Sequence, residues 1–134
     1  MRSSLSGNNV AMAIKCKRGE LYWVDWSPAR GTEIIGIRPA LIIQNDIGND
    51  ISPKTIVASC STAPEKPFPF LVRVTAQESG LPKDCNINLA TIMTIDKSRL
   101  CDKCGELSRE KMDEVDKALQ ISLGLNGVLR TIDS

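Results

Sequence analysis

Arg38 is the residue whose type and position most favour chemistry on a phosphate group. It stands between a turn-rich segment, 27–36, and an apolar run, 39–44, that should form a rigid strand. A guanidinium is permanently charged, and its forked N–H groups match two phosphate oxygens at once. An arginine at the edge of a strand also forms surface ion pairs, so these residues alone leave both interpretations open.

The chain contains no histidine, and this absence narrows its chemistry. It excludes Ser-His-Asp and Cys-His nucleophiles, zinc sites built on histidine, and nucleases that use a pair of histidines. We therefore predict neither a metal ion nor another cofactor. Any hydrolytic chemistry must come from other side chains.

Five cysteines, an odd number, accompany a polar start, 1–9, that lacks a secretory signal. This combination predicts free thiols in the reducing environment of the cytoplasm. Cys101 and Cys104 form a CxxC pair, but a single pair without histidine is a weak zinc signal. Redox pairs of this kind normally open a helix in a thioredoxin-like unit. We expect two free thiols on a turn.

The composition predicts one folded domain. Hydrophobic residues make up 42% and charged residues 25% of the 134 residues, and this size suits a single core. The formal net charge of +1 means that any nucleic-acid contact requires a local patch. No run approaches the roughly 18 apolar residues of a membrane helix. We expect 1–15 to be a flexible extension, with an ordered arm as the alternative, and 16–134 to be a single domain.

Short runs rich in β-branched, aromatic and apolar residues predict five strands, separated by segments rich in turn-forming residues. The strands are expected at 19–26, 39–44, 54–60, 70–75 and 85–93, the last of them bent. The second run is continuously apolar, which indicates burial on both faces of the sheet. The connections at 45–53, 63–69 and 80–83 are expected to be loops or turns, and 96–100 a short 3₁₀ turn.

One helix is predicted from Arg109 to Leu123, with Ser108 as its N-cap and Gly124 as its C-cap. Its apolar face carries Met112, Val115, Leu119 and Ser122–Leu123. Closely spaced short strands followed by one helix are typical of a mainly β fold. We expect a small antiparallel β-barrel with the C-terminal helix packed on it.

Six blocks occur in order and with fitting gaps between about 17 and 125: Arg18–Asp25, Gly31–Glu33, Gly36–Asp46, Ser52–Ala58, Thr94–Leu100 and Met112–Leu125. Together they resemble the MazF/PemK family of toxins. The resemblance implies an SH3-like barrel that forms a homodimer and cuts single-stranded RNA, such as mRNA, at short sequences without a metal ion. It also implies a cognate antitoxin whose acidic or flexible C-terminal tail covers the RNA groove, and binding of operator DNA only as the toxin–antitoxin complex.

The resemblance assigns roles to two residues. The arginine of the Arg-Pro pair is catalytic in the family, which gives this role to Arg38. A hydroxyl after the Ile-Val-Ala strand binds the scissile phosphate, and the matching residue is Ser61, with Thr62 next to it. A strand-end cap is the alternative for Ser61. RNA can be cut by its own 2′-hydroxyl, so the protein would supply charge and hydrogen-bond donors aimed at the phosphorus.

Other residues are candidates for binding the substrate. Thr32 and Glu33 lie in the loop after Gly31; the Glu33 carboxylate could lie near the 2′-hydroxyl, although a solvated loop acid is the favoured interpretation. Arg30 and Arg73 could contact phosphates or remain on the solvated surface.

Aromatic side chains could stack on bases. Phe68 and Phe70 flank Pro69 in a proline-rich segment and are the better candidates. Trp23 or Trp26 is more often part of the core, because one face of an alternating strand must be buried.

The second half of the family's usual site is altered. Many relatives carry a glutamine and an arginine where this chain has Thr91 and Met93, and the PemK branch carries an arginine and an aspartate where it has Asn88 and Ala90. We keep Thr91 as a substrate-binding candidate, but no acid–base partner for Arg38 is identified. The changes favour two alternatives: a non-catalytic toxin, like the related gyrase-poisoning CcdB toxins, that binds a protein target, or an inactive member that binds only antitoxin and operator DNA.

Overall fold

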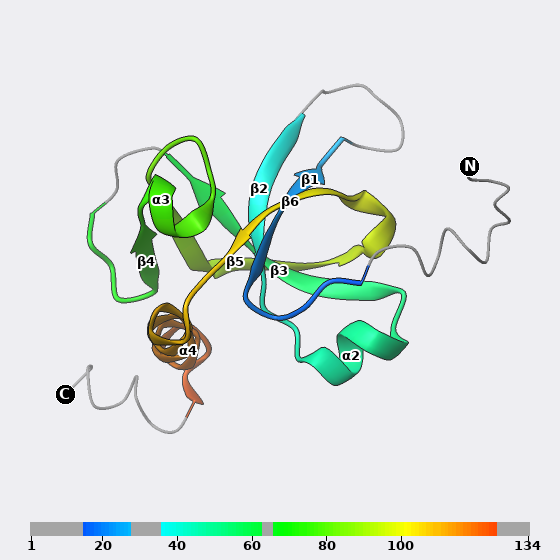
Figure 1. Ribbon diagram of the computed structural model, residues 1–134. Helices are drawn as coiled ribbons and strands as arrows, with labels where there is room; N and C mark the ends of the chain where they lie inside the picture. Colours follow the sequence, from blue (N-terminus) through cyan, green and yellow to red (C-terminus); the bar gives the residue numbers. More distant parts are fainter. Residues whose placement is uncertain (1–14, 28–35, 63–65, 126–134) are drawn as a thin grey trace, which may run out of the picture.

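A computed structural model describes residues 15–27, 36–62 and 66–125, in which one antiparallel sheet dominates (Figure 1). Its strands are β1 (Glu20–Asp25), β2 (Ile37–Ile42), β3 (Lys54–Ser61), β4 (Leu71–Val74), β5 (Cys85–Asp96) and β6 (Leu100–Glu106). They lie in the order β4-β5-β3-β2-β1-β6. The helices are α2 (Asp46–Ile51), α3 (Ala76–Ser79), the 3₁₀ turn η1 (Lys97–Arg99) and α4 (Arg109–Leu123). Within these residues, no helix has the length and apolar character needed to cross a membrane.

The five predicted strands and the 3₁₀ turn are confirmed, and β5 extends three residues beyond its predicted end at Met93. The expected bend in β5 coincides with a register shift against β3. Ala58 pairs with Ile92, whereas the next residue, Ser59, pairs with Asn88. The extra residues of β5 at this point form a bulge, which bends a strand and increases its twist.

Three elements differ from the prediction. The expected loop at 45–53 contains α2, because the Asn45 side chain accepts the N–H of Gly48 at 2.8 Å and caps a helix. Helix α3 was not predicted; a reciprocal capping box between Thr75 and Glu78 stabilises it. Cys101 and Cys104, which were expected on a turn, lie in strand β6. This strand pairs with β1 in antiparallel orientation.

Both faces of the sheet are apolar at its centre, so residues 40–43 are buried as predicted. One cluster lies between the sheet and α4 and includes Leu21, Leu41 and Ile87. The other lies on the opposite face and includes Tyr22 and Val24. The central strands therefore have little freedom to shift register, since a slip by one residue would exchange the two faces.

Helix α4 begins and ends as predicted and packs against β4 and β5 (Figure 1). The Ser108 hydroxyl accepts the N–H of Lys111 at 3.1 Å, and Gly124 ends the helix at φ 70°. Val115 is buried within the predicted apolar face. Leu123 is 54% exposed, so the predicted apolar face ends before it.

Strand β6, at one edge of the sheet, contacts the turn after α3 through backbone atoms. Strands β4 and β6 are the edges of the sheet, and no ladder joins them within the residues described. A β-carbon on Gly80, which has φ +81°, would lie 2.2 Å from the carbonyl oxygen of Cys104. A β-carbon on Gly105 would lie 2.5 Å from the carbonyl oxygen of Ser79. The turn after α3 thus rests directly on β6, which limits how far the sheet can open.

A polar cluster around Asn49 fixes α2 to the sheet. Asn49 is 2% exposed, and its Oδ1 accepts from Thr55 Oγ1 at 2.7 Å and from Gln44 Nε2 at 3.0 Å. Its Nδ2 donates to the carbonyl of Gln44, and its own carbonyl accepts from the ammonium of the buried Lys97. Buried polar groups are stable only when paired in this way.

We predict that Asn49→Ala lowers the free energy of unfolding by about 2–3 kcal/mol, because it leaves buried partners of the amide unpaired. Urea unfolding would measure the change. Asp50→Ala, at the exposed neighbouring position, should stay within about 0.5 kcal/mol of the wild type. Equal stability of the two variants would show that the cluster does not hold α2.

We also predict that Gly105→Ala destabilises the fold by about 1–3 kcal/mol, since the new methyl group must displace backbone. Thermal unfolding at matched concentration would detect it. Asp102→Ala changes an exposed residue of the same strand and should have little effect. An unchanged melting temperature for Gly105→Ala would mean that the contact with the α3 turn is loose.

Candidate active site

The candidate active site lies where the hydrogen-bonded ladder between β2 and β3 ends. The two strands pair from Ile42 to Ala40, and Ala40 lies opposite Ser59. Beyond Ala40 the ladder stops, although β2 stays paired with β1 as far as Ile37. Pro39 stands at this point and has no N–H to donate. The strands part here, and Arg38 on β2 faces Ser61 on β3 across the opening.

Strand register extends this row of side chains across the sheet. Ser61 pairs with Asn86 on β5, and Asn86 pairs with Arg73 on β4. Arg73 Nη1 lies 3.4 Å from Asn86 Oδ1. The row therefore carries an arginine at each end and a hydroxyl and an amide between them. Arg38, Ser61 and Arg73 were predicted from the sequence and Asn86 was not, because only strand pairing places it beside Ser61. Neither Asn86 nor Arg73 lines a cavity at this opening.

Two cavities adjoin at this opening and share Arg38, Pro39, Cys60 and Ser61. The larger has a volume of about 440 Å³ and the smaller about 240 Å³. Trp23, Thr62, Leu81, Pro82, Lys83 and Cys85 complete the larger. Trp26, Ser59, Thr91 and Met93 complete the smaller.

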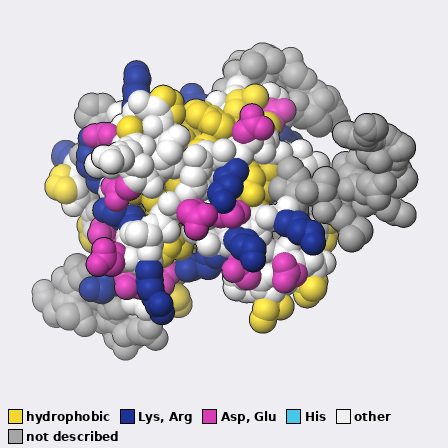
Figure 2. Space-filling model, in the orientation of Figure 1, with side chains coloured by type: hydrophobic (Ala, Val, Ile, Leu, Met, Phe, Trp, Pro, Cys, Tyr) yellow, Lys and Arg dark blue, Asp and Glu magenta, His cyan; other side chains and the backbone are white. Residues whose placement is uncertain are grey.

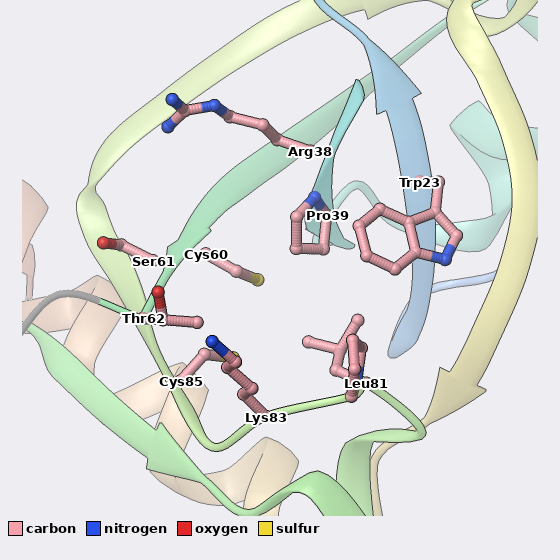
Figure 3. Close-up of a pocket in the computed structure, with 10 residues that line it drawn as sticks. Trp23, Arg38, Pro39, Cys60, Ser61, Thr62, Leu81, Lys83 and Cys85 are labelled. Carbon is pink, nitrogen blue, oxygen red and sulfur yellow. The ribbon is translucent and has the colours of Figure 1, made fainter. Parts of the chain in front are cut away.

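The larger cavity has an apolar side and a polar side (Figure 3). Trp23, Pro39 and Leu81 lie together on one side, while the Arg38 guanidinium and the hydroxyls of Ser61 and Thr62 lie on the other. The Lys83 ammonium points into the space from the turn before β5. Ser61 lines both cavities and Thr62 only the larger, which favours Ser61 as the partner of Arg38.

The charges that line the larger cavity, among described residues, are the two cations Arg38 and Lys83. Arg38 is exposed, and it forms no hydrogen bond or ion pair with any residue that the structure describes. Acidic and basic side chains are mixed on the face that Figure 2 shows. A chain of net charge +1 therefore gathers positive charge at this opening, which suits an anionic ligand.

Cys60 and Cys85 form the floor of the larger cavity and are both buried. The hydrogen bond between the two thiols, together with burial, raises the pKa of Cys60 well above its ordinary value. The same hydrogen bond lowers the pKa of Cys85. The strongly raised pKa keeps the Cys60 thiol protonated, so it packs as a neutral group rather than acting as a nucleophile.

The smaller cavity leads on to a third, of about 350 Å³, because Trp26 and Met93 line both. Lys54, Asp96 and Arg99 line the third, and the Lys54 ammonium is ion-paired with Asp96 at 3.3 Å. The three cavities form a continuous depression that could accept an extended polymer. Thr91 and Met93, two of the four altered positions, line the smaller cavity with Arg38, whereas Asn88 and Ala90 line none of the three.

Other predicted binding residues lie apart from the cavities. Phe68 and Phe70 stack on each other, with ring centroids 5.1 Å apart and planes 9° apart, and neither lines any of the three cavities. Arg30, Thr32 and Glu33 fall outside the described residues.

Lys83, like Asn86, was not predicted from the sequence. It belongs to a predicted turn, and a lone lysine there carried no signal.

Within the residues described, no group of three or more His, Cys, Asp or Glu side chains could hold a metal ion.

Comparison with known proteins gives one consistent result. A family model described as PemK-like, MazF-like toxin of type II toxin-antitoxin system matches residues 17–123. Endoribonuclease EndoA of Bacillus subtilis is 50% identical over 110 residues, which cover 81% of this chain and 95% of that protein.

Solved structures agree with this result. A mycobacterial endoribonuclease in complex with its cognate antitoxin superimposes with a TM-score of 0.70 at 25% identity, covering 82% of this chain and 96% of that one. The MazE-MazF complex (Form-III) of Deinococcus radiodurans has a TM-score of 0.70 at 23% identity, covering 84% and 100%, and supports the fold. The family predicted from the sequence is confirmed: the chain is a homologue of endoribonuclease EndoA and belongs to the PemK-like, MazF-like toxins of type II toxin–antitoxin systems.

Proposed function

We propose that this protein is a toxin endoribonuclease that cuts single-stranded RNA, including mRNA, at the opening between β2 and β3. The observation that carries the proposal is the Arg38 guanidinium, which is exposed, unpaired among described residues, and placed across from the Ser61 hydroxyl. The relationship to an endoribonuclease at 50% identity supports it.

The reaction uses a nucleophile that belongs to the RNA. The 2′-hydroxyl gives up its proton to water as its oxygen attacks the adjacent phosphorus, the bond to the 5′-oxygen of the next nucleotide breaks, and that oxygen takes up a proton from water. The products are a 2′,3′-cyclic phosphate and a 5′-hydroxyl. The protein needs no nucleophile of its own, which accords with a chain that lacks histidine.

Arg38 and Ser61 act on the charge that develops at phosphorus. The guanidinium fork donates to two non-bridging oxygens, and the Ser61 hydroxyl donates a further hydrogen bond. Such preorganised donors are often the largest part of a rate enhancement. Among the described residues, no carboxylate lines either cavity next to Arg38, so charge stabilisation is the main contribution these cavities offer.

The depression that continues past Trp26 and Met93 would hold neighbouring nucleotides and give the cleavage its sequence selectivity. The same concentration of positive charge suits an antitoxin tail that is acidic or flexible and covers the groove. We further infer that the curled sheet belongs to the SH3-like barrel type, that the toxin is a cytoplasmic homodimer, and that operator DNA is bound only in complex with the antitoxin.

One observation favours a second candidate, a member of the family that binds its partners without cutting RNA. Thr91 and Met93 line the cavity beside Arg38. Neither a hydroxyl nor a thioether can exchange a proton readily near neutral pH, so the site would lack a strong acid or base there.

We predict that the purified protein cuts a long single-stranded RNA in excess chelator and leaves cyclic-phosphate ends, and that Arg38→Ala lowers kcat by a factor of about 100–1000. Gel mapping of the fragments and their end groups would measure this. Arg109→Ala removes an exposed cation of α4 and serves as the matched control. Intact RNA at high protein concentration would favour the second candidate.

We predict that Ser61→Ala slows cleavage about 10- to 100-fold, while Ser61→Thr, which keeps the hydroxyl, stays close to the wild type. Thr62→Ala should cost less, since Thr62 lines only the larger cavity. Single-turnover rates on one defined RNA would compare the three. A larger loss for Thr62→Ala than for Ser61→Ala would assign the phosphate contact to Thr62.

A further inference from the structure

Lys83 lines the larger cavity together with Arg38, although it comes from a different part of the fold. Its ammonium points into the space from the turn between α3 and β5, whereas Arg38 reaches it from β2 (Figure 3). Lys83 is exposed and has no hydrogen bond or ion pair with any described residue. Its charge is therefore available to a ligand.

The adjacent acid does not neutralise Lys83. Asp84 is the next residue, but its Oδ1 accepts the N–H of Ala76 at 2.7 Å. That hydrogen bond turns the carboxylate toward the start of α3. The larger cavity keeps two cations and, among its described lining residues, no anion.

The backbone that carries Lys83 is anchored on both sides. Leu81 is 6% exposed, and its N–H donates to Ser79 Oγ at 3.1 Å. Cys85 is 2% exposed and begins β5 in register with Val74 on β4. The close approach of Gly80 to the Cys104 carbonyl fixes the turn further. A short turn held in this way fixes the backbone from which the Lys83 side chain reaches the cavity, which lowers part of the entropic cost of binding.

We propose that Lys83 binds a phosphate of the RNA next to the scissile one, so that the strand is held between Lys83 and Arg38. The inference rests on the proposed function and adds a substrate-binding residue to it. An ammonium is a compact cation without a preferred fork, which suits a phosphate that must be held but does not react. Arg38, with its fork, then meets the phosphate at which charge develops.

The test uses a single-stranded RNA that spans a cleavage site mapped with the wild type and carries 2′-deoxyribose at the reacting nucleotide. Binding of this RNA would be measured over a range of salt concentrations for the wild type, Lys83→Ala, Lys83→Arg and Lys117→Ala. Lys117 is an exposed lysine of α4 and is the matched control. Melting temperatures would be recorded for all four.

Lys83→Ala should weaken binding about 3- to 10-fold and reduce the slope of log K against log salt by about 0.7, the value for one phosphate contact to a single strand. Lys83→Arg should restore both, and Lys117→Ala should match the wild type. With cleavable RNA, Lys83→Ala should raise KM more than it lowers kcat, because the contact is made before the reaction. A structural role alone would not change the salt slope.

The outcomes separate the two proposals. If the wild type binds and cuts RNA while Lys83→Ala keeps the wild-type affinity and salt slope, the role of Lys83 is overturned and the proposed function stands. If Lys83→Arg binds as weakly as Lys83→Ala, the charge is not what the site uses and the inference is also overturned. If the wild type neither binds nor cuts RNA, the proposed function fails and the role of Lys83 fails with it.

Discussion

The separation of β2 from β3 beyond Ala40 is the constraint on which the site depends. A sheet that stayed paired would fill the space between Arg38 and Ser61 with backbone hydrogen bonds. Pro39 cannot donate one, and β2 remains bound to β1, so the opening is made without loosening the strand that carries Arg38. The two side chains are thus held on rigid elements while the space between them stays accessible, a combination that catalytic geometry requires.

The position of the opening is set by packing that lies away from it. Apolar clusters on both faces of the sheet fix the register of the central strands, and a shift by one residue would turn Arg38 to the other face. On the far side, the turn after α3 rests on β6 through Gly80 and Gly105, where no β-carbon fits. That contact holds the turn whose residues Leu81 and Lys83 line the larger cavity. The same packing therefore supports both the edge of the sheet and the site.

The electrostatics of the molecule are local. The net charge is +1 and charges of both signs are mixed on the face that Figure 2 shows, so the positive charge that an anion would meet at the opening comes from the exposed cations of the cavity. The altered positions Thr91 and Met93 line the smaller cavity, next to Arg38. Arg38 lines both cavities at the opening, whereas Trp26 lines the smaller one and the third.

Strands and helices that are marked by patterns within a short stretch of sequence could be predicted without the structure. Alternating and apolar runs located five strands, Ser108 and Gly124 bounded α4, and ordered motif blocks identified the family. The sequence did not locate β6, because a strand of charged residues and cysteines forms only when β1 is there to pair with it. The linear sequence likewise contains no signal that Asn86 lies beside Ser61 or that Lys83 lines the cavity. Strand register and the docking of the α3 turn, which join residues far apart in sequence, are what bring them to Arg38.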